Sequence, residues 1–456
     1  MDKTRLLATV AAVTATAGLL AACAPGSGTS SETESTAVEP SDINTDLSGL
    51  GDITLTVWDQ LVRGGQDEQI QRLNEAFMDK YPNITIERVS QSFDDLETTL
   101  RGALTGNDAP DVVQANNGRG TMGAFVSAGL LRNLDPYAQA YGWGDRFSED
   151  VLAVSRYSSD GVTFGEGNLY GLPQVGEVVG AYYSRSALEK VADEDELLGG
   201  DFATFTDILA RAKKEGMTPL QLGNLEGWPA VHVFGPIQAQ HVPAEKIRTL
   251  AMGNKGASWL SDGNIAAAQQ LADWSQKGYF NEGVNGTDYD AAWQHFASGE
   301  GVFLIAGSWL AADLQEAMGD DLGFFVPPTA EGELSTTGAT GLPFAVTAQS
   351  PHPDAAAGYI DFITSDAAME TIAETGNMPV NRTEELAPSD GVNADIYAAF
   401  GQVSTEGHLL PYLDWATPTM GDTIGSALQN LIAGQATPQE AMAKLEEDYT
   451  SFTSGG

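Results

Sequence analysis

Apolar residues along the chain switch between the pattern of a strand and the pattern of a helix from about residue 53 onward. Residues 53–58 form a β-branched run, which predicts a strand. Ile70, Leu73 and Phe77 then fall on one face of a helix, and residues 84–89 form a second strand-like run. Strand, helix and strand in this order predict a βαβ unit with parallel strands and a right-handed crossover.

The pattern continues with a helix over residues 93–105 and a third strand at residues 110–114. We interpret these elements as the start of a doubly wound sheet, whose ligands bind beyond the carboxyl ends of the strands. Aromatic, amide and carboxylate side chains lie at the ends of the three strands. The first candidate ligand-binding residues are therefore Trp58, Asp59, Gln91, Asn116 and Asn117.

Residues 167–188 interrupt this regular pattern. They contain a turn, a short hydrophobic segment that stops at Pro173, a glycine-marked gap and a second extended segment rich in aromatic residues. Two extended segments separated by a kink are what a chain needs when it leaves one lobe and enters another. Glu177 lies at this expected lobe edge, and its carboxylate could accept two hydroxyl groups.

The downstream half predicts further strands, turns and helices. Residues 226–229 form a turn that carries Trp228, and residues 301–309 form a buried strand that ends in Trp309. Amphipathic helices are predicted near the end of the chain, at residues 420–432 and 438–449.

Several short motifs occur in the order that is typical of one family. They are a YG-x-P step at residues 170–173, an xYYxxxxL segment that ends at Leu188, an F-x-x-G and G-S-W pattern that ends at Trp309, and a G-x-x-P-V pattern at residues 376–380. From about residue 53 to its end, the chain resembles the extracellular solute-binding proteins of ABC importers, of the sugar-binding type.

This resemblance implies an α/β, two-lobed, periplasmic-binding-protein-like fold. Each lobe would have a mostly parallel sheet flanked by helices, and hinge strands would join the lobes. The resemblance implies a first lobe made of residues 51–175 and 322–395, and a second lobe made of residues 176–321 and of the C-terminal helices in residues 396–456. It also implies that Trp309 stacks against the ligand.

The N-terminus predicts export and a lipid anchor. Lys3 and Arg5 precede a short apolar run, so residues 1–22 are typical of a signal peptide. Cys23 is the only cysteine, and the residues before it resemble a bacterial lipobox, which predicts lipidation of Cys23; ordinary secretory cleavage is the alternative. Residues 23–50 carry almost no apolar pattern and are interpreted as the lipidated cysteine and a flexible linker. We therefore expect the protein at the extracytoplasmic face of the bacterial cell membrane.

The formal net charge is −41, from 22 basic and 63 acidic residues. This field repels phosphate backbones, so nucleic-acid binding is excluded, and it disfavours anionic ligands that lack a local cationic pocket. The acidity keeps a surface protein soluble, with adaptation to a salty habitat as the alternative. The expected partners are a carbohydrate, the transmembrane subunits of an ABC permease and the membrane, and the protein itself is expected to be a monomer.

The sequence carries no motif for catalysis or for cofactor binding. Its five histidines include no pair spaced i, i+4, and neither a G-x-S-x-G sequence nor a phosphate-binding loop occurs. The acidic run at residues 193–196 lacks the glycine turn of a calcium loop and is interpreted as a solvated face. We predict no enzyme activity, no metal site and no cofactor.

The aromatic residues indicate the kind of ligand. A pyranose ring has an apolar face and a rim of hydroxyl groups, so its site needs flat aromatic platforms and short polar groups. The candidate platforms, each of which could instead pack in the core, are Trp58, Trp228, Trp309 and Trp415. The candidate rim residues are Asp59, Gln91, Asn116, Asn117 and Glu177. We assign to packing Trp143, Trp259, Trp274 and Trp293.

These observations predict a substrate-binding lipoprotein of an ABC transporter. It would capture a mono- to oligosaccharide between two closing lobes and deliver it to a membrane permease. Three alternatives stay open: a binding protein for a polyamine or peptide, which an acidic cleft favours; a secreted glycoside hydrolase; and a surface adhesin or sensor subunit.

Overall fold

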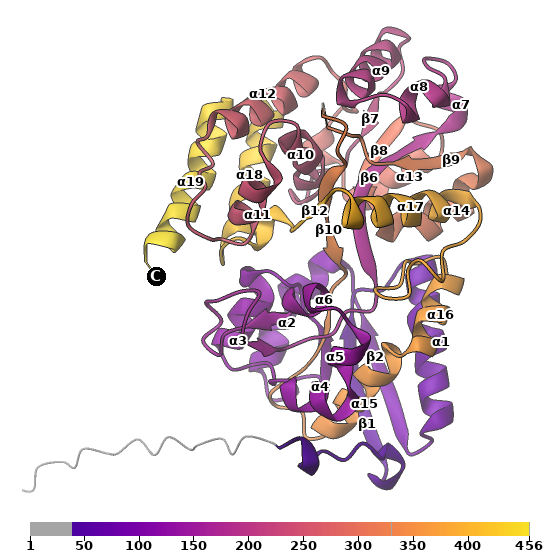
Figure 1. Cartoon of the computed structure of the whole chain (residues 1–456), viewed down its shortest axis with the longest axis vertical. Helices are drawn as coiled ribbons and strands as arrows, with labels where there is room; N and C mark the ends of the chain where they lie inside the picture. Colours follow the sequence, from indigo (N-terminus) through magenta and orange to yellow (C-terminus); the bar gives the residue numbers. More distant parts are fainter. Residues whose placement is uncertain (1–38, 330, 456) are drawn as a thin grey trace, which may run out of the picture. The chain divides into compact units, whose positions relative to one another are not determined.

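The computed structural model describes residues 39–329 and 331–455, and Pro40–Gly456 is one compact unit. The predicted signal peptide at residues 1–22 and the lipidation site at Cys23 lie outside the described residues. Two main sheets, each flanked by helices, form the framework of the unit (Figure 1).

The first sheet contains β11 (Phe344–Val346), β3 (Val112–Gln114), β1 (Ile53–Asp59) and β2 (Ile84–Ser90), in that order. β1 pairs in parallel with β2 and with β3, as the sequence predicts. β11 joins the sheet antiparallel to β3. This sheet is therefore mostly parallel, as expected.

Helices α1 (Gly64–Lys80) and α15 (Pro353–Ile363) pack together in the core of the first lobe. α1 buries Ile70, Leu73 and Phe77, which is the apolar face that the sequence predicts. The Phe77 ring lies edge-on to the Tyr359 ring of α15, with 5.3 Å between their centroids. Segments far apart in the sequence are thereby joined in one hydrophobic core.

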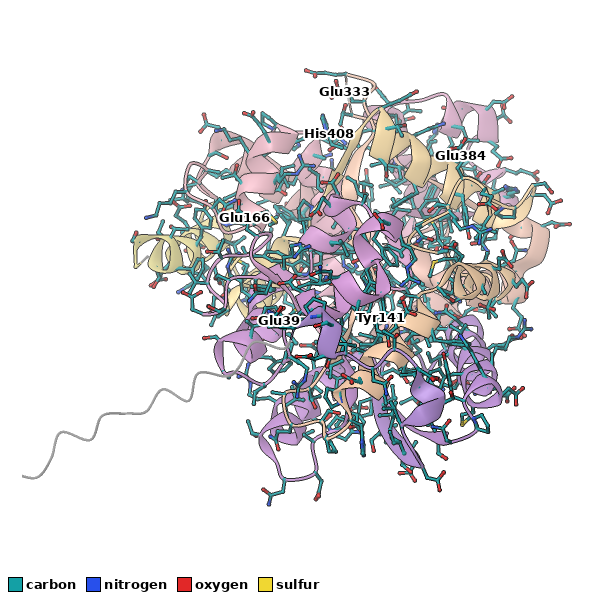
Figure 2. All side chains as sticks on the ribbon, turned by 60° about the horizontal axis from the view of Figure 1, so that its bottom comes forward. Glu39, Tyr141, Glu166, Glu333, Glu384 and His408 are labelled. Carbon is teal, nitrogen blue, oxygen red and sulfur yellow. The ribbon has the colours of Figure 1, made fainter. Side chains whose placement is uncertain are left out.

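The second sheet is mixed, so the expectation of a mostly parallel sheet is wrong for this lobe. Its long central strand β6 (Gly176–Ser184) is buried at every residue. β6 pairs antiparallel with β8 (Phe303–Gly307), β9 (Leu322–Phe325) and β10 (Ser335–Thr340). Parallel pairs lie farther out, between β7 (Leu220–Gln221) and β8 and between β10 and β12 (His408–Leu410). At the start of β12, His408 Nε2 lies 3.6 Å from Glu333 Oε2 (Figure 2).

The chain returns to the first sheet later than residue 322. β9 pairs with β6, and its Phe324 ring packs edge-on against Tyr182 at 4.9 Å, so β9 belongs to the second sheet. The return takes place after β10, between Thr340 and Phe344. The boundary expected at residue 322 is therefore wrong, because two buried phenylalanines hold β9 in the second sheet.

Three chain segments run side by side where the chain crosses between the two sheets. Residues 172–176, 340–344 and 378–380 are joined by backbone pairing. The paired residues at the crossings are Gly176 with Thr340, Leu172 with Phe344, and Val175 with Pro379.

After the third crossing, α17 (Gly391–Thr405) packs against β9, so the boundary expected at residue 395 falls inside a helix of the second lobe.

Order begins before residue 51, which corrects the linker predicted at residues 23–50. Ile43 and Leu47 are 8% and 1% exposed and belong to the core of the first lobe. The Asn83 side chain also donates a 3.0 Å hydrogen bond to the Leu47 carbonyl. Two apolar residues in a polar stretch are too weak a pattern to predict an element, but they suffice to hold this segment on the folded body.

The remaining elements cover the sheets. Near the C-terminus, α18 (Met420–Ile432) and α19 (Pro438–Ser454) pack beside α12 (Asp262–Gln276) (Figure 1). The other helices and strands are α2 (Phe93–Thr105), α3 (Ala124–Ser127), α4 (Asp135–Tyr141), α5 (Trp143–Arg146), α6 (Glu149–Ala153), β4 (Arg156–Tyr157), β5 (Asn168–Leu169), α7 (Arg185–Leu188), α8 (Glu194–Leu198), α9 (Phe202–Lys214), α10 (Pro229–Ala239), α11 (Ala244–Ala251), α13 (Tyr289–Ala297), α14 (Ala311–Met318) and α16 (Asp366–Glu374).

Three of the four tryptophans assigned to packing are fully buried. Trp143 and Trp259 are 0% exposed and Trp274 is 1% exposed, which confirms their assignment. Trp293 is partly buried, and its indole N–H donates a 3.0 Å hydrogen bond to Asp290.

Candidate functional site

A pocket lies beyond the carboxyl ends of β1 and β3, between the two lobes. It contains about 740 Å³ of empty space, counting the part that is open to solvent. The first lobe contributes Gln60, Arg63, Gln66, Phe93, Asn116 and Asn117. The second lobe contributes Glu177, Trp228, Val231, His232, Trp309, Tyr412, Asp414 and Trp415, and Thr340 and Leu342 lie at the crossing.

The pocket brings together most of the sequence-predicted site residues. Those that line it are Asn116, Asn117, Glu177, Trp228, Trp309 and Trp415. The predicted residues that do not line it are Trp58, Asp59 and Gln91.

Asp59 is a structural residue. Its carboxylate is fully buried and receives two hydrogen bonds from the Arg88 guanidinium, at 2.6 and 2.8 Å. The Leu61 amide donates a third, at 2.9 Å. Burial raises the pKa of Asp59, and the Arg88 guanidinium opposes this shift. The next residue, Gln60, lines the pocket instead.

Trp58 and Gln91 also lie outside the pocket lining. Trp58 is half-buried and packs against the core that contains Leu96 and Leu100 of α2. Gln91 accepts a 2.9 Å hydrogen bond from the Thr99 hydroxyl. Phe93, two residues after Gln91, is the side chain of this segment that lines the pocket.

Aromatic rings form a connected wall on the second-lobe side. The His232 ring lies 5.3 Å from Trp228, 5.2 Å from Trp309 and 5.6 Å from Tyr412, between ring centroids. Tyr412 lies 5.1 Å from Trp415. Such ring pairs combine large apolar area with fixed geometry. The rings therefore form one connected aromatic cluster, in which the planes of neighbouring rings are tilted by 50–61°.

His232 and Tyr412 were missed by sequence reasoning. His232 lies in α10, which is apolar on nearly all sides, and it follows Trp228 by one helical turn. Burial lowers the pKa of His232 to about 3, so the ring is neutral. The spacing of four residues from Trp228 is the signal that could have identified it.

Trp309 is fixed in orientation by its neighbours. Its indole N–H donates a 2.7 Å hydrogen bond to the Tyr289 hydroxyl. A Cβ atom at Gly307 would overlap the Trp309 ring, so the glycine of the G-S-W motif leaves room for the tryptophan. A fixed aromatic ring loses little conformational freedom when a ligand stacks on it.

Two carboxylates line the pocket. Glu177 is 9% exposed and accepts a 2.9 Å hydrogen bond from the Tyr412 hydroxyl. Burial raises the pKa of Glu177 to about 7 and that of Asp414 to about 6. Near neutral pH both carboxyl groups are therefore partly protonated, and they can accept hydrogen bonds from hydroxyl groups in their ionised form and also donate in their protonated form.

The first-lobe wall is polar, and some of its groups are already engaged. The Asn117 side chain donates a 2.7 Å hydrogen bond to the Val154 carbonyl. By contrast, Gln66 Oε1 and the Thr340 hydroxyl at the crossing have no hydrogen-bond partner among the described residues. Both residues are buried, with 4% of their surface exposed. Buried polar atoms without partners are costly unless a ligand or water satisfies them.

The lobes contact each other on two sides of the pocket. Arg63 of the first lobe forms a 2.9 Å ion pair with Asp290 and lies over the Tyr289 ring at 5.6 Å. Arg119, also from the first lobe, donates hydrogen bonds to the Met252 carbonyl at 2.7 Å and to the Ala416 carbonyl at 3.2 Å. The pocket is thus enclosed by contacts that a separation of the lobes would break.

Over residues 39–329 and 331–455, no cluster of three or more histidine, cysteine or acidic side chains could hold a metal ion. Within the same residues, no helix combines the length and apolar composition that spanning a membrane requires.

Known proteins with similar sequences include two curated relatives. The chain is 24% identical over 351 residues to the maltodextrin-binding protein MdxE of Bacillus subtilis (strain 168), covering 74% of this chain and 76% of that protein. It is 22% identical over 326 residues to the multiple sugar-binding protein of Streptococcus mutans serotype c, covering 69% and 72%.

A solved structure of a chitin oligosaccharide binding protein matches with a TM-score of 0.74 at 19% identity, covering 89% of this chain and 100% of that one. This likeness shows the two-lobed α/β periplasmic-binding-protein fold. The model of one family, the bacterial extracellular solute-binding proteins, matches residues 64–370. Because this match spans more than half of the sequence, the chain belongs to the bacterial extracellular solute-binding protein family.

Proposed function

We propose that the protein captures a carbohydrate, from a mono- to an oligosaccharide, in the pocket between its lobes and delivers it to the transmembrane subunits of an ABC permease. As a member of a solute-binding family the chain binds its ligand and is not an enzyme. The observation that carries the carbohydrate assignment is the pocket itself, in which a connected aromatic wall faces amide, carboxylate and hydroxyl groups. The relatives named for maltodextrin, multiple sugars and chitin oligosaccharide support the same ligand class.

The aromatic wall would bind the apolar face of a sugar ring, with Trp309 as the central platform. Trp228 and Trp415 extend this platform, and His232 and Tyr412 join them. The hydroxyl rim of the sugar would be bound by Asn116, Asn117, Gln66, Thr340 and Glu177.

Transport follows from differential affinity. A ligand that contacts both walls stabilises the state in which the lobes meet, and only that state would dock productively on the permease. Bending would take place at the three crossings, residues 172–176, 340–344 and 378–380, where few backbone pairs join the lobes. We propose a first lobe of residues 40–174 and 342–380 and a second lobe of residues 176–340 and 391–455.

Export and anchoring belong to the same proposal. The predicted signal peptide at residues 1–22 would direct export, and a lipid on Cys23 would hold the protein at the extracytoplasmic face of the bacterial cell membrane. Labelling cells with a radioactive fatty acid should label the wild-type protein and leave the Cys23→Ser variant unlabelled. Label on the Cys23→Ser variant would contradict the anchor.

A ligand panel tests the carbohydrate assignment. Maltotriose, cellotriose, chitotriose and raffinose should include at least one sugar that raises the melting temperature and binds in calorimetry, because a ligand that binds only the folded state stabilises it. Polyamines and peptides belong in the same panel, since the two pocket carboxylates would suit a cation. Stabilisation by an amine or a peptide, with none by any sugar, would overturn the proposal.

A further inference from the structure

We infer that the pocket selects saccharides by charge: it accepts uncharged sugars and excludes sugars that carry a carboxylate, and Glu177 and Asp414 set this selectivity. The inference rests on the proposed function, because it specifies the class of carbohydrate that the pocket binds.

The charges that line the pocket are unbalanced. Glu177 and Asp414 are acidic, and Arg63 is the one cation among the described residues of the lining. The Arg63 guanidinium is already engaged, because it pairs with Asp290 at 2.9 Å and lies over the Tyr289 ring. The one cation of the described lining therefore already shares its charge with a protein carboxylate.

The two pocket carboxylates have no cationic partner in the part of the chain that the structure describes. Glu177 receives its hydrogen bond from the neutral Tyr412 hydroxyl, and neither Glu177 nor Asp414 takes part in an ion pair within the described residues. The raised pKa values of both groups agree with this, because burial without a compensating cation disfavours the charged form.

Further acidic groups from both lobes lie near residues that line the pocket, although they do not line it themselves. Asp94 and Glu97 lie on α2 of the first lobe, and Glu226 precedes Trp228 in the second lobe. Burial raises the pKa of Glu97 to about 7; the charges of Asp414 and Asp94 add to this shift, while the Thr121 hydrogen bond and the Arg101 charge oppose it. Burial also raises the pKa of Glu226, and the charge of Asp94 adds to that shift. A carboxylate on the ligand would therefore meet negative potential from both sides, in a site where burial reduces screening by water.

An uncharged sugar meets no such barrier. Its hydroxyl groups can donate to Glu177 and Asp414, whose oxygens accept without the need for a counter-charge. The aromatic side chains of the wall carry no formal charge, so discrimination between charged and uncharged sugars would fall to the two carboxylates.

The test compares two ligands that differ in charge but hardly in shape. The panel sugar that binds best is oxidised at a primary hydroxyl to the carboxylate, and the matching neutral carboxamide is made at the same position. Calorimetry at pH 8 should show the carboxylate binding at least about tenfold more weakly than the carboxamide.

Two double variants assign the effect to the pocket. In Glu177→Gln with Asp414→Asn, the ratio of the two dissociation constants should fall below about threefold. The control, Glu282→Gln with Asp320→Asn, removes the same formal charge at exposed positions outside the pocket and should keep the wild-type ratio. Thermal melts of both double variants check that each is folded.

The outcomes are distinct. Equal affinities for the carboxylate and the carboxamide in the wild type would overturn the inference, as would a ratio that survives in the pocket variant. If no sugar of the panel binds the wild type at all, the proposed function fails first and for a different reason.

Discussion

The two walls of the pocket differ in chemistry, although both lobes build them from the ends of strands and helices. The second-lobe wall consists mainly of rings packed 5.1–5.6 Å apart. The first-lobe wall consists of amides and a guanidinium, with Phe93 as its single aromatic residue. Stacking tolerates many ligands, whereas hydrogen bonds demand particular positions. The difference teaches that the rings of the second lobe would hold the sugar, and that the first-lobe amides together with the two carboxylates Glu177 and Asp414 would recognise it.

The largest expected effect concerns the buried acid of the second wall. Glu177 has its pKa raised from 4.5 to about 7, so it binds more protons in the folded state than in the unfolded state. The contribution of Glu177 to the free energy of unfolding should therefore fall as the pH rises from about 4.5 to about 7 and stay level above that range. Glu177→Gln removes this loss, so the stability of the variant relative to wild type should rise by about 3 kcal/mol between pH 4.5 and pH 8.

Urea unfolding of both proteins at several pH values measures this difference. The same scan on Glu282→Gln, an exposed acid outside the pocket, provides the control. If the difference in the free energy of unfolding between Glu177→Gln and wild type does not vary with pH, the pKa of Glu177 is not raised by burial.

The central platform of the aromatic wall should dominate sugar affinity. Replacing Trp309 by Ala should weaken binding by about 1–3 kcal/mol, because it removes the face on which the ring stacks. Trp58→Phe is the matched control, since Trp58 packs against the core and does not line the pocket. Calorimetric affinity that is unchanged in a folded Trp309→Ala protein would assign Trp309 to packing alone.

A smaller effect on sugar affinity is expected for Thr340, and Thr336 of the same strand, β10, serves for comparison. Thr340 lines the pocket and its hydroxyl has no partner among the described residues, whereas the Thr336 hydroxyl donates a 2.8 Å hydrogen bond to the Val179 carbonyl. Thr340→Val should weaken sugar binding by about 1 kcal/mol without loss of stability. Thr336→Val should lower the free energy of unfolding by about 1 kcal/mol and leave affinity unchanged.

Both threonine variants are measured by calorimetry and by urea unfolding. If Thr340→Val destabilises the protein as much as Thr336→Val does, its hydroxyl has a structural partner and takes no part in the recognition of the sugar.

The smallest effect is expected for the contact between the walls at the rim. The Arg63–Asp290 pair is partly exposed, with 53% of the Asp290 side chain accessible, and such pairs contribute about 0–1 kcal/mol. A double-mutant cycle with Arg63→Gln and Asp290→Asn should give a coupling in ligand affinity of this size that decreases with added salt. A coupling that does not respond to salt would show that the contact is not electrostatic.

The sequence predicted the aromatic wall better than the polar wall. Trp228, Trp309 and Trp415 were identified because they follow strands or lie in turns, and a large ring at such a position reaches a pocket from many orientations. Asp59 was misassigned because its partner Arg88 lies on the neighbouring strand, and the register of a sheet is not visible in one sequence. Whether the residues of the two walls bind ligand stays a prediction.

The sequence predicted the fold where the spacing of apolar residues stays regular over a long segment. The βαβ start was recovered because α1 carries a regular apolar face between two strands. The boundary at residue 322 was wrong because β9 has only four residues, which fit either sheet by pattern, and only the packing of Phe324 on Tyr182 decides between them. Short buried strands are placed by tertiary contacts that local sequence does not encode.

A crystal structure of the protein with the panel sugar that raises its melting temperature most tests the central claim most directly. We predict a sugar ring against Trp309, with its hydroxyl groups hydrogen-bonded to first-lobe amides and to Glu177. Density for the sugar at another place on the protein, or a sugar in the pocket that touches only one of the two walls, would contradict the account.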